Sequence, residues 1–190
     1  PMNKRRGQFV KIDQNPFDYV DLKSEDWLCF PAKIGKIIVY AYFHKSFYEL
    51  GFHLSNLFEP ANKEDLKKKP DAVYLYGVRK GALDELADMP TVYHYYEDED
   101  LLVAAVPRDK EFGYFGYLKK MMLTLHNTRV MMNGHMPFHG AFYKLTLKNN
   151  KSGNFLLIGD SGAGKSESIE AFRRLAESQL KEMTIIADDM

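Results

Sequence analysis

A phosphate-binding loop motif constrains this chain more than any other feature of its sequence. Positions 159–166 read GDSGAGKS, which matches the pattern G-x-x-x-x-G-K-[ST], and they directly follow the apolar run 155–158. The glycines let backbone N–H groups face phosphate oxygens, the lysine adds a mobile positive charge, and the serine hydroxyl can ligate Mg²⁺. Such a loop requires a strand before it and a helix after it. The residues expected to bind a nucleoside triphosphate, ATP or GTP, are Gly159, Asp160, Ser161, Gly162, Ala163, Gly164, Lys165 and Ser166.

The residues after the loop have the pattern of a helix followed by a second strand. Over 166–180, apolar residues recur at nearly helical spacing, and the short apolar run 183–187 then ends in Asp188 and Asp189. A strand–loop–helix–strand unit almost always places its two strands parallel, so that both end at the same edge of the sheet. We therefore expect both aspartates beside the loop, where a nucleotide-bound metal ion needs carboxylate oxygens. The alternative is that the aspartates cap the next element.

Charge and cysteine content narrow the classes of partner. The 26 basic and 26 acidic residues cancel, so no overall field favours nucleic acid or an anionic membrane. Cys29 is the only cysteine, which excludes an internal disulfide and favours a reducing cytosol. The residues around it, 27–30, are apolar, so we expect Cys29 in the core. No apolar run reaches membrane-spanning length and no signal peptide is recognisable, so we expect a cytoplasmic protein with neither nucleic-acid nor membrane partners.

The rest of the chain reads as a mixed α/β fold. Runs rich in Val, Ile, Tyr and Phe predict strands at 36–43, 72–78, 91–96, 101–106, 141–147, 155–158 and 184–187. Helices are expected at 82–87, around 117–126 and at 166–180, whereas 47–58 is ambiguous. The alternation typical of strands stops near 107–113. We therefore expect a mixed α/β region of unknown role at 1–112 and a nucleotide-binding region at 113–190. A single strand–helix–strand unit leaves the adenine pocket unbuilt, so the second region is expected to be incomplete at its C-terminus.

Two further segments extend the motif into a family resemblance. Lys119 and Lys120 lie on the helix expected around 117–126, and His139 precedes the strand before the loop. The order Lys-Lys, His, phosphate-binding loop, Asp-Asp resembles phosphoenolpyruvate carboxykinases. In that family the segments G-E-x-K-K, H-C-S-A, G-x-S-G-x-G-K-[ST] and G-D-D occur in the same order. The resemblance covers roughly 113–189, and it departs from the family pattern at Tyr117, in place of Glu, and at Gly140, in place of Cys.

The sequence of the loop is also similar to that of a second family, the HPr kinase/phosphorylases. Their pattern runs His-Gly, G-D-S-G-x-G-K-S-E and A-D-D, and this chain has His139-Gly140, GDSGAGKSE at 159–167 and ADD at 187–189. The two families share a nucleotide-binding architecture. The chain is identified as a member of their common superfamily, which implies a mixed sheet with a carboxykinase-like phosphate-loop unit.

The carboxykinase resemblance implies a role for each matching residue. Lys120, His139 and Asp189 would ligate a Mn²⁺ that holds an oxyacid substrate, and Ser166 would ligate the Mg²⁺ of the nucleotide. Asp188 would position the waters of that Mg²⁺, and Lys165 would bridge the phosphates. The implied reaction is an enzymatic one, in which oxaloacetate loses CO₂ and the resulting enolate takes the γ-phosphoryl group of ATP or GTP.

Three alternatives stay open at this point. Under the HPr-kinase pattern, Asp188 or Asp189 accepts the proton of a seryl acceptor while His139 orients it, so that Lys165, His139 and both aspartates remain the catalytic set. The chain could also be a nucleotide-binding module or fragment without turnover. Read without the resemblance, Lys120 is a solvated helix residue and His139 a hydrogen-bonded residue at a strand edge. The oligomeric state is not predicted.

Overall fold

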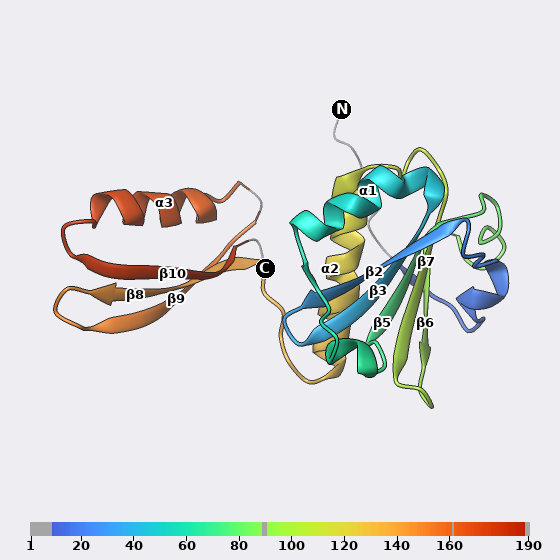
Figure 1. Ribbon diagram of the computed structural model, residues 1–190, viewed down its shortest axis with the longest axis horizontal. Coiled ribbons are helices and arrows are strands. Elements are labelled where there is room, and N and C mark those ends of the chain that lie inside the picture. Colours follow the sequence, from blue (N-terminus) through green and yellow to red (C-terminus); the bar gives the residue numbers. More distant parts are fainter. Residues whose placement is uncertain (1–8, 89–90, 161, 189–190) are drawn as a thin grey trace. The chain divides into compact units, whose positions relative to one another are not determined.

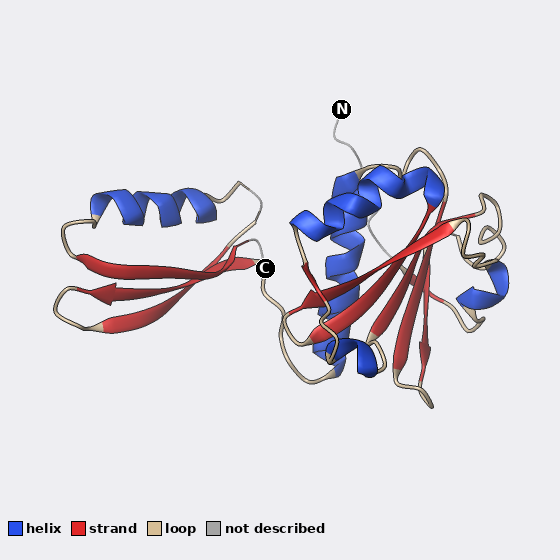
Figure 2. Ribbon diagram, in the orientation of Figure 1, coloured by secondary structure: helices blue, strands red, loops and turns tan. Residues whose placement is uncertain are grey.

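The chain folds into two compact units, each with its own sheet. The computed structural model describes residues 9–88, 91–160 and 162–188. Unit 1 comprises Pro1–His135 and unit 2 comprises Met136–Met190. Unit 1 contains a seven-stranded sheet and unit 2 a three-stranded sheet, and helices pack on both (Figure 1; Figure 2). The mixed α/β class expected from the sequence is thus confirmed.

The sheet of unit 1 mixes parallel and antiparallel pairs. Strands β3, β5 and β7 run parallel to one another at its centre, whereas β2 pairs antiparallel with β3, and β6 pairs antiparallel with β7. The strands are β1 (Val10–Lys11), β2 (Trp27–Ile34), β3 (Ile37–His44), β4 (Glu59–Pro60), β5 (Ala72–Val78), β6 (Val92–Tyr96) and β7 (Leu101–Pro107), in the spatial order β1-β6-β7-β5-β3-β2-β4.

Both faces of β5 and β7 are buried. Every residue of β5 and of β7 is buried, which explains their nearly continuous apolar sequences, since a strand covered on both faces has no solvent side. Val73, Leu75 and Val103 belong to one core cluster. Helix α2 (Phe115–Met132) contacts β3, β5 and β7 and buries a stripe of side chains that includes Leu118 and Met122 (Figure 1). The core of unit 1 is therefore built around these parallel strands.

Short helical turns complete unit 1. The segment whose structure the sequence left ambiguous, 47–58, forms the five-residue helix α1 (Tyr48–Phe52) and a 3₁₀ turn. The 3₁₀ turns are η1 (Pro16–Tyr19), η2 (Lys45–Phe47), η3 (His53–Asn56) and η4 (Asp65–Lys67).

Unit 2 is a three-stranded antiparallel sheet with one helix on it. It consists of β8 (Gly140–Leu147), β9 (Ser152–Ile158), helix α3 (Lys165–Leu175) and β10 (Leu180–Asp188), in the spatial order β10-β8-β9. Ile169 of α3 is buried against Ala141 and Tyr143 of β8. Phe142 and its partner Leu156 therefore lie on the opposite sheet face, which α3 does not cover.

The strands that flank the loop do not pair directly, in contrast to a simple parallel crossover. Strand β8 lies between β9 and β10 and is antiparallel to both, so β9 and β10 run in the same direction on either side of it. Their C-terminal ends still meet at one edge, because Ile158 pairs with Gly140 and Asp188 pairs with the next residue, Ala141. The expectation of a common edge is thus confirmed for Asp188, whereas Asp189 lies outside the described residues.

Several sequence expectations for unit 1 are wrong. Residues 82–86 form turns and no helix, since their backbone hydrogen bonds, such as that from Leu86 to Leu83, reach back three residues and not four. Cys29 is exposed on β2, so it does not fill the core. The division between the units also falls after His135, later than the boundary expected near 107–113, because α2 packs on the sheet of unit 1.

No helix in the described part of the chain is both long and apolar enough to cross a membrane.

Candidate functional site

The phosphate-loop motif connects the end of β9 to the start of α3. Gly162 has φ of +83° and Gly164 φ of +84°, which is the left-handed region that glycine enters without steric cost. Gly164 is also the residue that precedes the first turn of α3. The unpaired N–H groups and the partial positive charge of a helix N-terminus favour an anion at this position. The loop conformation is therefore suited to hold a phosphate group against backbone amides.

The Lys165 side chain folds back over the loop. Its Nζ donates to the carbonyl oxygens of Gly159 at 2.8 Å and of Asp160 at 2.9 Å. These bonds hold the ammonium above the loop, and the side chain is only partly exposed. Carbonyl oxygens are neutral acceptors, so an anionic phosphate oxygen can replace them with a stronger, charge-assisted bond.

A serine and an aspartate meet at the edge of the sheet. The Ser166 hydroxyl donates to Asp188 Oδ1 at 2.9 Å, which joins the first turn of α3 to the end of β10. Both side chains are exposed. A hydroxyl and a carboxylate are oxygen donors of the kind that Mg²⁺ binds through one or two protein ligands, with waters and nucleotide phosphates supplying the rest. The pair therefore fits the Mg²⁺ of a bound nucleotide.

His139 lies at the same edge, immediately before β8. Its carbonyl oxygen accepts a hydrogen bond from the Gly159 N–H at 3.4 Å, so the two segments are in contact where the loop begins. The next residue, Gly140, is close to β9: a Cβ added to it would lie 2.6 Å from the Leu157 carbonyl oxygen. Only glycine fits there without a backbone shift. The glycine that follows His139 thus has a structural reason, which the sequence alone did not reveal.

The expected site residues are only partly brought together. His139, Lys165, Ser166 and Asp188 lie at one edge of unit 2, whereas Lys120 is exposed on α2 of unit 1. Ser161 and Asp189, which the sequence also assigns to the site, lie outside the described residues. Within the described ranges, no three His, Cys, Asp or Glu side chains gather as a metal-binding group. Because Asp189 lies outside the described residues and Lys120 and His139 belong to different units, we derive no step through Mn²⁺.

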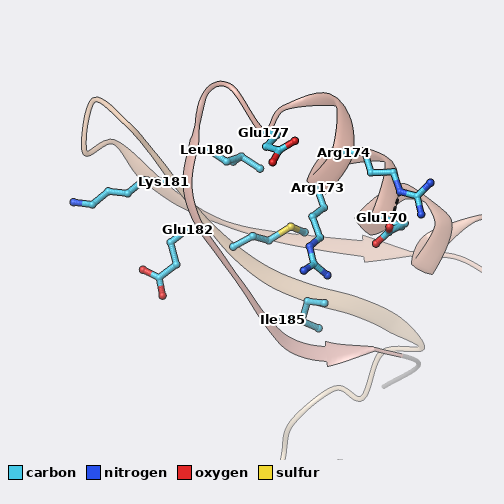
Figure 3. Close-up of a pocket in the computed structure, with 9 residues that line it drawn as sticks. Glu170, Arg173, Arg174, Glu177, Leu180, Lys181, Glu182 and Ile185 are labelled. Carbon is cyan, nitrogen blue, oxygen red and sulfur yellow. Dashed lines mark hydrogen bonds and ion pairs between the residues drawn. The ribbon is translucent and has the colours of Figure 1, made fainter.

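A cavity of about 620 Å³ opens on unit 2 at some distance along the helix from the loop. It lies between the C-terminal half of α3 and the first half of β10, with Ile185 beneath Arg173 (Figure 3). Arg174 Nε pairs with Glu170 Oε1 at 2.7 Å on its rim. The charged side chains that line it are Arg173, Arg174, Lys181, Glu170, Glu177 and Glu182. Because basic and acidic groups are equal in number, the cavity has no evident preference for an anion.

No protein-family model matches the chain, and the search of curated proteins gives no significant match.

Proposed function

We propose that unit 2 binds a magnesium nucleoside triphosphate and that the protein is a nucleotide-dependent phosphotransferase. The observation that carries this proposal is the hydrogen bond of 2.9 Å between Ser166 and Asp188 at the end of the phosphate-loop motif. This hydrogen bond brings together a hydroxyl and a carboxylate, the oxygen donors that a nucleotide-bound Mg²⁺ requires. Both lie beside the loop whose conformation suits the phosphates.

Each residue then has a distinct task. The loop amides and the N-terminus of α3 bind the phosphates, and Lys165 exchanges its carbonyl partners for phosphate oxygens. Ser166 and Asp188 hold the Mg²⁺, which when bound neutralises charge on the β- and γ-phosphates. Since phosphoryl transfer depends mainly on positioning and electrostatic stabilisation, this arrangement supplies most of what the nucleotide side of the reaction needs.

The first candidate acceptor is a small oxyacid, as in the carboxykinases. Oxaloacetate would lose CO₂ by cleavage of a C–C bond, and the oxygen of the resulting enolate would take the γ-phosphoryl group from ATP or GTP. The products are phosphoenolpyruvate, CO₂ and the nucleoside diphosphate. The resemblance assigns Lys120, of unit 1, and His139, of unit 2, to this reaction.

The second candidate acceptor is a seryl hydroxyl, and the geometry at Gly140 favours it. The close approach of the Leu157 carbonyl leaves no space for the Cys side chain of the carboxykinase pattern, whereas the kinase pattern has glycine here. In this reaction Asp188 or Asp189 accepts the hydroxyl proton as the hydroxyl oxygen forms a bond to the γ-phosphorus, and the nucleoside diphosphate leaves. All residues that it uses belong to unit 2.

The test begins with calorimetric titration of the full chain with Mg-ATP and with Mg-GTP, followed by turnover assays. Phosphoenolpyruvate formed from oxaloacetate supports the first acceptor. Phosphate transferred to a seryl peptide without oxaloacetate supports the second, and binding without any turnover supports a nucleotide-binding module. A folded protein that binds neither nucleotide at millimolar concentration would contradict the proposal.

A further inference from the structure

A second cavity, of about 690 Å³, opens at one edge of the sheet of unit 1. The parallel strands β3, β5 and β7 end there, at His44, Val78 and Pro107, because parallel pairing brings their carboxyl ends to the same side. In open α/β sheets, ligands bind outside the carboxyl ends of the strands. The cavity is therefore where the topology of unit 1 favours a ligand.

The acidic side chains at this edge are largely neutralised by lysines. The only carboxylate that lines the cavity without such a partner among the described residues is Asp18, which is exposed. The ion pairs are Asp21–Lys23 at 3.1 Å, Asp26–Lys45 at 2.5 Å and, beside Arg108, Asp109–Lys80 at 2.6 Å.

Two arginines at the cavity, in contrast, have no carboxylate partner. Nη1 of the half-buried Arg108 lies 2.7 Å from Nε2 and 3.0 Å from Nδ1 of His44, and its side chain pairs with no carboxylate in the described part of the chain. Arg79 is exposed, and its side chain makes no hydrogen bond or ion pair to any described residue. Burial lowers the pKa of His44 and the Arg108 charge lowers it further, which favours the neutral imidazole beside the guanidinium.

We propose that this cavity binds a small molecule that carries a carboxylate or phosphate group, through Arg79 and Arg108. The planar fork of a guanidinium matches both groups with paired hydrogen bonds. His44 holds the Arg108 guanidinium in place before the ligand arrives, which reduces the entropy lost on binding. The site belongs to unit 1 alone, so it does not depend on the nucleotide site proposed for unit 2.

The chain contains its own reporter for this site. Trp27, the only tryptophan, lines the cavity, and its ring meets that of His44 edge-on with 5.5 Å between centroids. We would titrate the full chain with malonate, and separately with inorganic phosphate, at an ionic strength held constant with NaCl. A saturable change in tryptophan fluorescence is expected with at least one probe. Saturation by one probe alone identifies the acidic group that the site prefers.

Four variants test whether the arginines bind the probe. Arg108→Gln and Arg79→Gln should each raise the Kd about tenfold or more, since each removes a charge-assisted bond. Arg79 is exposed, so its variant keeps the test valid even if Arg108→Gln fails to fold. Arg174→Gln, at an exposed arginine of unit 2, should titrate like the wild type. Lys165→Ala should also keep the fluorescence response, which separates this site from the phosphate loop.

Two results would overturn the proposal. One is a fluorescence change that never saturates or that NaCl alone reproduces. The other is an unchanged Kd in Arg79→Gln together with an unchanged Kd in a folded Arg108→Gln.

Discussion

Ser166 and Asp188 are 22 positions apart in the chain, yet the serine hydroxyl donates to the aspartate carboxylate at 2.9 Å. The register of β10 on β8 produces this contact, because it places Asp188 opposite Ala141 while β9 ends opposite Gly140. Both side chains are exposed, so the hydrogen bond itself adds only about 1 kcal/mol to stability. The contact matters mainly because it holds two oxygen donors side by side at the loop.

Ser166→Ala and Asp188→Asn should each abolish the benefit of Mg²⁺ for nucleotide binding. We expect the wild type to bind ATP or GTP roughly tenfold more tightly with Mg²⁺ than without it, which corresponds to ~1.4 kcal/mol. In each variant the ratio of the Kd measured without Mg²⁺ to the Kd measured with Mg²⁺ should approach one. Combining the two changes should add little, because both remove the same metal interaction. Calorimetry with and without EDTA measures the ratio, and Ser178→Ala, at another exposed serine of unit 2, is the matched control. Additive losses in the double variant would show that the residues act separately.

Lys165→Ala should weaken nucleotide binding at all magnesium concentrations. The ammonium now bonds to two neutral carbonyl oxygens, and phosphate oxygens would give it stronger, charge-assisted partners. Losing such a bond costs roughly 1.5–3 kcal/mol, so the Kd should rise about 10- to 100-fold. Lys151→Ala, at an exposed lysine of the β8–β9 turn, should leave the Kd unchanged. Equal effects of the two substitutions would indicate a general charge effect and no specific contact.

Gly164→Ala tests the loop conformation without adding a steric clash. The residue has φ of +84° and an added Cβ would meet no atom within 4 Å, so the strain comes from the backbone alone. A cost of about 1 kcal/mol is expected, together with weaker nucleotide binding as the amides reorient. Gly35, in the β2–β3 turn, has φ of +62° and is equally open, so Gly35→Ala should lose similar stability and keep full binding. Urea denaturation and calorimetry on both variants measure these effects. If Gly164→Ala binds nucleotide normally, the loop amides do not hold the phosphates.

Local sequence patterns predict the central strands and the loop well. The runs that form β5 and β7 are nearly continuously apolar, as is typical of strands buried on both faces. The loop motif and its flanking strand and helix are likewise local, and the common edge follows from the chain direction of β9 and β10. The nearness of Asp188 to Ser166 could therefore be expected from residues alone.

Features that depend on distant pairing were not predictable in the same way. Strand β2 contains Pro31, which lacks a backbone donor and obscures a strand pattern, and its place between β3 and β4 depends on partners elsewhere in the chain. The position of β8 between β9 and β10 is a matter of strand order, which no periodicity in 155–187 reveals. Likewise, nothing local to Lys120 indicates that its helix belongs to the first sheet.

Arg129 is expected to be the charged residue on which the stability of unit 1 depends most. It is only 5% exposed, on the last turns of α2, and its Nη1 donates to Asp100 Oδ1 at 2.5 Å, while its Nε lies 3.6 Å from Asp71 Oδ1. Arg129→Leu should lower the free energy of unfolding by about 2 kcal/mol, less than for a fully buried ion pair because Asp100 is largely exposed. Urea denaturation measures the change. Arg173→Leu, at an exposed arginine, should have a much smaller effect, and equal losses would contradict the role of the ion pair.

The same ion pair should make stability depend on pH in the acid range. Arg129, and then the Tyr95 hydroxyl, hold the pKa of Asp100 well below its ordinary value, so the folded state binds fewer protons than the unfolded state. The contribution of Asp100 to the free energy of unfolding is therefore complete above the ordinary aspartate pKa of about 4, and it is lost as the pH falls below that value. Asp100→Asn keeps the shape of the side chain and tolerates the left-handed φ of +48°, so it removes mainly the charge. The unfolding free energy of Asp100→Asn should decline less than that of the wild type between about pH 4 and pH 2, as measured by urea denaturation.

The control is Asp98→Asn, in the same turn and without an ion pair to a described residue, which should retain the wild-type dependence of unfolding free energy on pH. If Asp100→Asn retains that dependence too, the low pKa of Asp100 is not what stabilises the fold.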